Sequence, residues 1–555
     1  MKEKTLKCFR LLMLFAALLA NIKNIFVDYN GDGGYAVATA QRLIDGDGLF
    51  LRMWEPHQTS SFVMAGLMKI YESVFHTKEG IVLFLNISGF VLYVLVAIVF
   101  YAVIKEFTDK NTAFLMTFLI LVLRPKLVQI PDYANLAILF SVLMFAFLVK
   151  YFLRGNKIFD LIAASFFLFL DALSYPSCIV ISVGVIVCLL IYSKKKLRDI
   201  VISMGICLFF GCAYLIIPIH NLGFGGFFGR ILEVVKGDSH SGGSIYSGIN
   251  YFKELILGAV ILAACVLVSL IIKKVLDAVK RNAKVDFAGV LAVVVTVAFC
   301  VESLIIGGLV KDSNIAIWCI DKIVIVAVIV MGFFCYKDLN DNQKCVYVVS
   351  MIVSGGTLIG VVALTNLSFL TVFCYAHLAV TASIMALSAH CEKKEEKQDT
   401  VPVSKLSIAC VFIVLFVQGT CNLGTVENYV RTGPLKGMVT TLEQCNYNKI
   451  SVEEWSQNVS ETDSVLIANE YGSDPILYIL TDAKISVNST ISTPTFGDML
   501  KKYWEIYPDR EPSVIAVPCW EGRETRVVPV WLDTKIMSEY ERTSVGTCWI
   551  FYRKK

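Results

Sequence analysis

The sequence predicts an α-helical polytopic membrane protein that ends in an extracytoplasmic α/β domain. Three observations carry this prediction. The chain is 56% hydrophobic with a mean hydropathy of +0.67, well above a soluble protein of 555 residues. Apolar runs of membrane-spanning length recur up to residue 424. From Thr425 onward the composition becomes that of an ordinary soluble domain.

Composition and motifs exclude several other classes of protein. A net charge of +4 gives no support for nucleic acid as a partner. Most of the 17 cysteines fall inside apolar runs, where cysteine behaves as a small hydrophobic residue. No CxxC pair, Walker loop or Rossmann fingerprint is present, so the sequence offers no zinc, thioredoxin-like or nucleotide site.

About thirteen apolar segments are candidates for membrane spans, and together they make residues 1–424 a transmembrane domain. The third and fifth are short, so Thr112–Val149 and Leu161–Tyr192 can each be a helical hairpin or a re-entrant element. The first is expected to be an uncleaved helix, because no A-x-A cleavage site follows it. The predicted apolar cores are Leu6–Phe26, Ile81–Ile104, Thr112–Leu123, Ala134–Val149, Leu161–Leu173, Cys178–Tyr192, Val201–Ile219, Leu255–Ile272, Phe287–Val310, Ile315–Tyr336, Val346–Leu364, Ser368–Leu387 and Leu406–Gly424.

Basic residues predict the orientation of these spans. Lysine and arginine are retained on the cytoplasmic side, and they gather at the N-terminus and in every second loop after it. An odd number of spans then places the N-terminus in the cytoplasm and residues 425–555 outside. The first outer loop, residues 27–80, is expected to contain amphipathic helices. Residues 221–254 are rich in glycine and serine and predict a mobile outer loop, either a lid or a plain flexible connection.

The C-terminal segment 425–555 shows an alternation of short strands and helices, which indicates a small α/β domain. Val465–Ala468, Ser513–Val517 and Thr547–Tyr552 are expected to be strands, and Pro475–Leu480 and Phe496–Ile506 to be helical. The segment also holds three cysteines, and both one disulfide and three thiols are compatible with the sequence: Cys445, Cys519 and Cys548.

The first outer loop concentrates acidic groups directly after the first span. Asp32 begins a helical pattern, so its carboxylate can cap the helix, or it can deprotonate a hydroxyl at the membrane edge. Asp28, just before it, can serve either role. Further on, Glu55 and His57 lie beside Trp54 and can hold a sugar or phosphate; a solvated loop histidine is the ordinary alternative.

A second acidic candidate, Asp132, lies in the short outer turn RPKLVQIPDYANL. With Arg124 and Lys126 beside it, the carboxylate can organise a metal–phosphate contact. The Pro-Asp pair before an apolar run is equally a helix start. Four ionisable residues inside spans also fall near the outer ends of their helices, which favours an outward-open cavity: Asp171, Glu302, Asp321 and Lys322.

These features together resemble the GT-C class of integral-membrane glycosyltransferases, which includes protein mannosyltransferases, aminoarabinose transferases and oligosaccharyltransferase catalytic subunits. The resemblance rests on DGGY at Asp32–Tyr35 leading into ATAQRLIDGDGL, on Asp132 in PDYANL, and on about a dozen spans followed by an external domain. Where family members often have Asp-Glu, Gly33 follows Asp32 here, so Asp28 stays an alternative to it.

The resemblance implies a GT-C-like, inverting glycosyltransferase in a bacterial plasma membrane. Its donor would be a polyprenyl-phosphate sugar, and its acceptor an extracytoplasmic glycan, lipid or protein. It implies Asp32 or Asp28 as the base, and it implies that Asp132 binds a divalent metal, Mg or Mn, or positions the substrate. Substrate-binding residues would be Tyr35, Glu55, His57, Arg124, Lys126 and Arg230. The alternatives are a lipid-linked sugar transporter or flippase, and a non-catalytic cell-envelope assembly protein.

Overall fold

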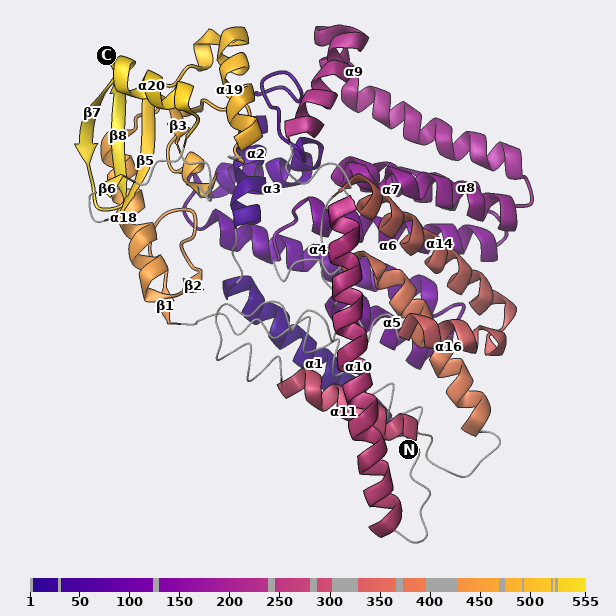
Figure 1. Cartoon of the computed structure of the whole chain (residues 1–555). Coiled ribbons are helices and arrows are strands. Elements are labelled where there is room, and N and C mark those ends of the chain that lie inside the picture. Colours follow the sequence, from indigo (N-terminus) through magenta and orange to yellow (C-terminus); the bar gives the residue numbers. More distant parts are fainter. Residues whose placement is uncertain are drawn as a thin grey trace.

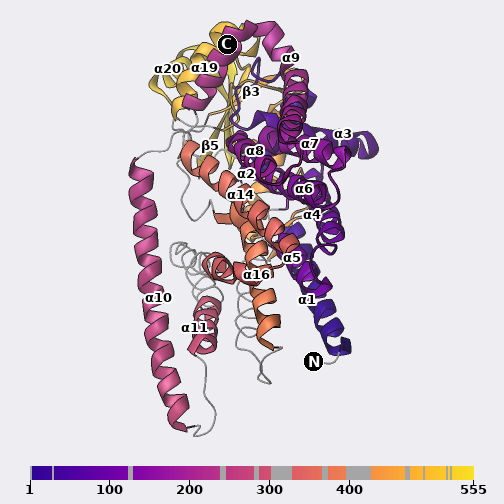
Figure 2. The same cartoon turned by 90° about the vertical axis from the view of Figure 1, so that its right-hand side faces the viewer.

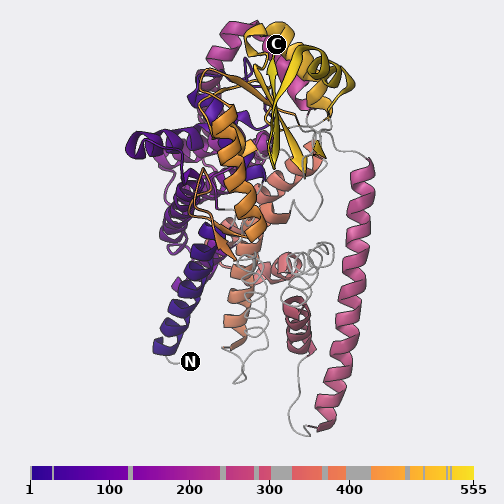
Figure 3. The same ribbon diagram turned by 90° about the vertical axis from the view of Figure 1, so that its left-hand side faces the viewer.

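In the computed structural model, the elements of the described residues are helices as far as Glu395, and the β-sheets lie in the C-terminal segment (Figure 1). The N-terminus and the C-terminal sheet lie at opposite ends of the molecule, as all three views show (Figures 1, 2 and 3). The structure describes residues 3–27, 31–122, 129–237, 245–279, 287–301, 328–365, 373–395, 427–468, 475–491, 494–520, 523–524 and 528–555.

Within the described residues, five helices are long and apolar enough to cross a membrane. Their apolar stretches are Arg10–Val27, Ile81–Ile104, Tyr133–Leu153, Lys196–Lys236 and Asp341–Leu364. Two shorter apolar helical stretches are Lys110–Val122 and Pro176–Tyr192. The predicted helical membrane architecture is therefore confirmed in outline, and the number of thirteen spans stays a prediction. Predicted span 406–424 and most of span 315–336 lie outside the described residues.

The helical part packs around α6 (Tyr133–Leu153), which is buried on nearly all sides. Its neighbours include α4 (Ile81–Ile104) and α7 (Ile158–Ser174). Gly89 of α4 faces the backbone carbonyl of Gln129, leaving no room for a β-carbon. The remaining described helices are α1 (Glu3–Val27), α5 (Lys110–Val122), η2 (Pro176–Val180), α8 (Ile181–Tyr192), α9 (Lys196–Gly237), α10 (Ile245–Val279), α11 (Phe287–Val301), η4 (Tyr336–Asp338), α14 (Asp341–Leu364), η5 (Phe373–Ala376) and α16 (His377–Glu395).

The segment predicted as a mobile loop, 221–254, is largely helical in the structure. Helix α9 continues to Gly237 through a kink at Gly223, whose φ of 68° suits glycine. Beyond the kink, Phe227 is buried and packs edge-on against Phe50, with ring centroids 5.2 Å apart. Residues 245–254 belong to α10, and residues 238–244 lie outside the described part of the chain. The lid function stays a prediction.

The first outer loop folds into α2 (Gly31–Ile44), η1 (Gln58–Ser60) and α3 (Ser61–Phe75). Helix α2 is buried from Gly33 to Arg42, so it is an interior helix and not a surface one. Helix α3 buries Met64 and Met68 but exposes Ile70 and Val74. This two-faced pattern fits the amphipathic helix that the sequence predicts.

The C-terminal domain contains a mixed sheet with strand order β4-β3-β5-β8-β7. Strand β3 (Ser464–Ile467) pairs in parallel with β4 (Lys484–Ile485) and β5 (Val514–Trp520), whereas β5 and β7 (Tyr540–Val545) pair antiparallel with β8 (Trp549–Lys554). The three predicted strands are thus present. The other elements are β1 (Asn428–Tyr429), β2 (Val439–Thr440), α18 (Leu442–Asn458), η6 (Pro475–Ile479), α19 (Pro494–Ile506), η7 (Pro508–Arg510), β6 (Arg523–Glu524) and α20 (Val530–Glu539).

The first outer loop and the C-terminal domain share one hydrophobic core. Val37 of α2, Met68 of α3 and Leu85 of α4 belong to the same buried cluster as Ile515 and Trp549 of the sheet. Helix α2 packs directly on η6. The sequence predicts a domain boundary at residue 424, but the first outer loop on one side of it and the C-terminal domain on the other pack as one unit.

An acid-sensitive contact holds the end of β8 to the start of β3. The Arg553 guanidinium donates to both oxygens of Asp463, at 2.8 and 3.2 Å, and the Ser460 backbone N–H donates at 2.9 Å. Burial opposes ionisation, but these hydrogen bonds lower the pKa of Asp463 to about 2.

This contact predicts how stability changes with pH. An unfolded aspartate has a pKa of about 3.9. A carboxylate with a lower pKa in the folded state stabilises the fold above that value, and its contribution is lost as the pH falls from about 4 to about 2. The free energy of unfolding of the intact protein in detergent should fall over this range, and less steeply in Asp463→Asn. Equal slopes in the two proteins would contradict the prediction.

Candidate functional site

Asp32 lies in the first turn of α2 and is exposed. The partial positive charge at a helix N-terminus stabilises a carboxylate in this position. Tyr35 follows three residues later, so its side chain lies beside that of Asp32 on the helix surface. The Tyr35 ring is buried, and its hydroxyl accepts a hydrogen bond from the backbone N–H of His57 at 3.3 Å. Helix α2 and the His57 loop are thereby joined.

His57 connects this loop to the second acidic segment. Its imidazole stacks on the ring of Tyr133, with centroids 3.8 Å apart and planes 11° apart. Tyr133 is the first residue of α6, and Asp132 directly precedes it. The structure therefore brings Tyr35, His57 and the Asp132–Tyr133 turn into one place, and the exposed Asp32 lies one helical turn before Tyr35 on α2.

Two tyrosines from other elements complete an aromatic cluster with His57 and Tyr133. Tyr175, which follows α7, lies 5.4 Å from the His57 ring and 5.5 Å from the Tyr133 ring. Tyr375 of η5 stacks on Tyr175 at 5.7 Å. We call His57, Tyr133, Tyr175 and Tyr375 the aromatic cluster. Four separate parts of the chain meet in it.

Asp132 acts as the N-cap of α6. Its carboxylate accepts a hydrogen bond from the backbone N–H of Asn135 at 2.9 Å, and the residue is almost fully buried. The sequence allows this role, the start of a helix, as one of two alternatives for Asp132. Within the described residues, no three His, Cys, Asp or Glu side chains gather closely enough to hold a metal ion. Asp132 as the ligand of a divalent metal stays a prediction.

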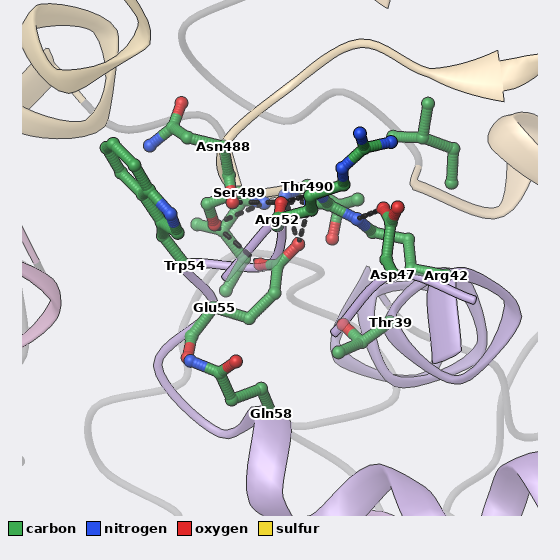
Figure 4. A network of polar contacts seen from close by, with 12 residues as sticks. Thr39, Arg42, Asp47, Arg52, Trp54, Glu55, Gln58, Asn488, Ser489 and Thr490 are labelled. Carbon is green, nitrogen blue, oxygen red and sulfur yellow. Dashed lines mark hydrogen bonds and ion pairs between the residues drawn. The ribbon is translucent and has the colours of Figure 1, made fainter. Parts of the chain in front are cut away.

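Glu55 is held by the protein itself, in a buried group of charges that we call the Arg42 network (Figure 4). Arg42 of α2 donates to Asp47 at 2.9 Å and to Glu55 at 3.0 Å. The C-terminal domain supplies the remaining members: the Ser489 hydroxyl and the Thr490 N–H donate to Glu55 at 2.6 and 2.8 Å, and Arg510 pairs with Asp47. The network fastens the His57 loop to the C-terminal domain.

Burial and charge oppose each other in this network. Burial disfavours the charged form of Arg42, but the carboxylate of Asp47, with Tyr503 and Glu55, raises the pKa of Arg42 above its ordinary value. Burial likewise raises the pKa of Glu55, although Arg42 and Ser489 oppose the shift. Both carboxylate oxygens of Glu55 already accept hydrogen bonds, so its predicted contact with substrate stays an untested prediction.

Arg230 reaches the same loop from the kinked end of α9. Its guanidinium lies over the ring of Trp54, 3.5 Å from the centroid, and its Nε is 3.4 Å from Glu233. The side chain is only 9% exposed, and its buried Nη1 atom has no hydrogen-bond partner. Buried donors of this kind are rare and call for an explanation.

Three predicted site residues cannot be placed. Asp28, Arg124 and Lys126 lie outside the described residues. The aromatic partners of His57 were not predicted. Tyr133 could have been found beside Asp132 in PDYANL, but Tyr175 and Tyr375 carry no local signal, because only the packing of distant helices brings them together.

No family model matches the chain, and no curated protein matches its sequence. Its fold is similar to that of several solved structures at low identity. One is the oligosaccharyltransferase AglB from Archaeoglobus fulgidus in complex with an inhibitory peptide and a dolichol-phosphate. The TM-score is 0.45 at 11% identity, and the match covers 92% of this chain and 69% of that one.

A second similar structure is ArnT from Cupriavidus metallidurans bound to undecaprenyl phosphate. Here the TM-score is 0.41 at 13% identity, with 98% of this chain and 97% of that chain covered. The apo state of the same ArnT gives a TM-score of 0.41 at 12% identity and covers 98% of both chains.

Proposed function

We propose that the protein is a membrane glycosyltransferase that moves a sugar from a polyprenyl-phosphate carrier to an extracytoplasmic acceptor. One observation carries the proposal: Tyr35, His57 and the Asp132–Tyr133 turn meet at the start of α6, a helix of membrane-spanning length, and the exposed Asp32 lies one helical turn before Tyr35 on α2. A carboxylate exposed at the start of a buried helix combines access to an acceptor with a fixed position.

The proposed reaction is a single displacement. The acceptor hydroxyl oxygen attacks the anomeric carbon of the sugar as the bond from that carbon to the phosphate oxygen breaks. The bonding electrons leave with the prenyl phosphate, and Asp32 takes the proton of the attacking hydroxyl. Attack from the face opposite the phosphate inverts the configuration at the anomeric carbon. This reaction is written with the protein's own residues, and the use of a divalent ion stays a prediction.

Arg230 is the described residue best suited to the carrier phosphate. Its Nη1 is a buried donor without a partner, and its guanidinium lies over Trp54, which precedes His57 by three residues in the same loop. A guanidinium can donate to a phosphate in a fixed geometry and offset its negative charge as it leaves.

Replacing this guanidinium should weaken binding of the donor. A hydrogen bond to a charged group contributes about 1.5–3 kcal/mol, so Arg230→Gln should raise the KM for the prenyl-phosphate sugar by about 10- to 150-fold. The matched control is Lys236→Gln, which removes an exposed cation from the same helix and should leave KM unchanged. Equal effects of the two changes would remove Arg230 from donor binding.

The proposed function is tested in proteoliposomes that contain the purified protein. We expect sugar to pass from a synthetic polyprenyl-phosphate sugar to envelope glycan or lipid acceptors, and not from a nucleotide sugar. A parallel measurement follows movement of a fluorescent lipid-linked sugar between leaflets. Movement without transfer would favour the transporter, and neither activity would favour the assembly protein.

A further inference from the structure

Two cysteines face each other across neighbouring strands of the C-terminal sheet. In the antiparallel pair β5–β8, Val517 lies opposite Ile550 and Pro518 opposite Trp549. One step further along this register, Cys519 lies opposite Cys548, and its backbone N–H donates to the Cys548 carbonyl at 2.8 Å. Directly opposed residues in antiparallel strands send their side chains to the same face of the sheet.

The spacing of such a pair suits a disulfide. Opposed residues at a hydrogen-bonded position have Cα atoms about 5.5 Å apart, inside the range of about 4.4–6.8 Å found across disulfides. The Cys519 sulfur already points toward the facing strand, because it lies 3.5 Å from the carbonyl oxygen of Thr547, the residue before Cys548. In the structure both residues are thiols. Joining them needs side-chain rotation and a closer approach of the two strand ends, because the Cβ atoms of opposed residues lie about 4.5–5.5 Å apart and those of a disulfide about 3.5–4.5 Å.

The two thiols differ in how an oxidant can reach them. Cys519 is 8% exposed, whereas Cys548 is only half-buried and lies just before the first residue of β8. Burial, the carboxylate of Glu454 and the neighbouring Cys519 raise the pKa of Cys548 to about 11. A thiol with so little thiolate at neutral pH exchanges slowly, which is typical of a structural pair and not of a catalytic one.

We propose that Cys519 and Cys548 form a disulfide across β5 and β8 in an oxidising extracytoplasmic space. The oxidant is a disulfide-bearing thiol compound or oxidoreductase. The Cys548 thiolate attacks one sulfur of that disulfide and the other sulfur leaves as a thiolate. The Cys519 thiolate then attacks the Cys548 sulfur and releases the second thiolate. The two protein thiols are oxidised, the oxidant disulfide is reduced, and both protons end on the released thiols.

The third cysteine of the domain provides an internal control. Cys445 lies on α18, away from the β5–β8 register, and should remain a thiol. Between Cys519 and Cys548 the chain contains Arg523 and Lys535, so trypsin separates the two cysteines into different peptides unless a disulfide joins them. The readout is chemical and does not depend on the proposed transferase activity.

The first experiment blocks thiols in whole cells with N-ethylmaleimide before lysis and maps tryptic peptides of the purified full chain without reduction. We expect a linked Cys519–Cys548 peptide and an alkylated Cys445. In the second, reduced protein in detergent is incubated with oxidised glutathione. The wild type should form the link, whereas Cys519→Ser should accumulate a glutathione adduct at Cys548, because the resolving thiol is missing.

Two results would overturn the proposal. One is alkylation of both Cys519 and Cys548 in the whole-cell sample. The other is an equal glutathione adduct at Cys548 in the wild type and in Cys519→Ser. The melting temperature of Cys519→Ser, compared with that of reduced wild type, shows whether the variant folds, so a misfolded variant cannot be mistaken for support.

Discussion

Asp32→Asn should abolish most of the sugar transfer while leaving the protein folded. General-base catalysis by a positioned side chain contributes about 10²–10⁴-fold to a rate, so kcat should fall by that factor. Donor KM should change little, because the new amide cannot accept the proton but keeps the shape of the exposed side chain at the start of α2. The measurement is initial rates of transfer in proteoliposomes, with the melting temperature as the check on folding.

The matched control removes a different exposed carboxylate from the same loop. Glu79 pairs with Lys436 at 2.6 Å, and both side chains are about half exposed, so Glu79→Gln should change the rate by less than about two-fold. Asp28→Asn belongs in the same series because the sequence leaves Asp28 as an alternative base. Full activity of Asp32→Asn together with loss of activity in Asp28→Asn would contradict our assignment.

Arg42→Met should cause the largest loss of stability of any single change proposed here. The guanidinium is completely buried between Asp47 and Glu55, and its removal leaves Glu55 buried without an ionic partner. Breaking a buried ion pair on one side costs about 3–5 kcal/mol of unfolding free energy. Equilibrium unfolding in detergent, followed by the fluorescence of Trp54 and the other tryptophans, should show this loss.

Arg52→Met is the control for the loss of an arginine from the same loop. The Arg52 side chain pairs with Asp509 on the surface, where the two side chains are 40% and 51% exposed, so its loss should cost less than about 1 kcal/mol. The double variant Arg42→Met/Glu55→Gln should recover part of the stability, because it no longer buries an unpaired charge. Equal losses in Arg42→Met and Arg52→Met would show that the Arg42 network does not stabilise the fold.

The local parts of the fold could be predicted from the sequence. The span Ile81–Ile104 matches α4 at both ends, because an uninterrupted apolar run leaves the chain no other structure in a membrane. The Pro-Asp signal before α6 was also readable, although it did not decide between a cap and a metal ligand. The contact with Asn135 shows that Asp132 caps α6, and its role as a metal ligand stays a prediction.

Contacts between distant residues could not be predicted in this way. The protein partners of Glu55 could not be predicted, because Ser489 and Thr490 lie more than 430 residues further along the chain. Its contact with substrate stays a prediction. Arg42 was not singled out from the sequence, because nothing in the residues around it indicates that Asp47 folds back onto α2. Glycines around Gly223 predicted a loop, but the packing of Phe227 on Phe50 holds that segment as a helix.

The first outer loop depends on the C-terminal domain for partners in the Arg42 network, and this has a consequence for biosynthesis. Arg42 and Asn488 are separated by 446 residues, which a ribosome adds in roughly 20–90 s at about 5–20 residues per second. For nearly all of that interval Glu55 has been synthesised, while Ser489 and Thr490, which donate hydrogen bonds to it in the folded protein, have not. A chain interrupted before Ser489 would therefore keep the Glu55 carboxylate without two of its hydrogen-bond donors.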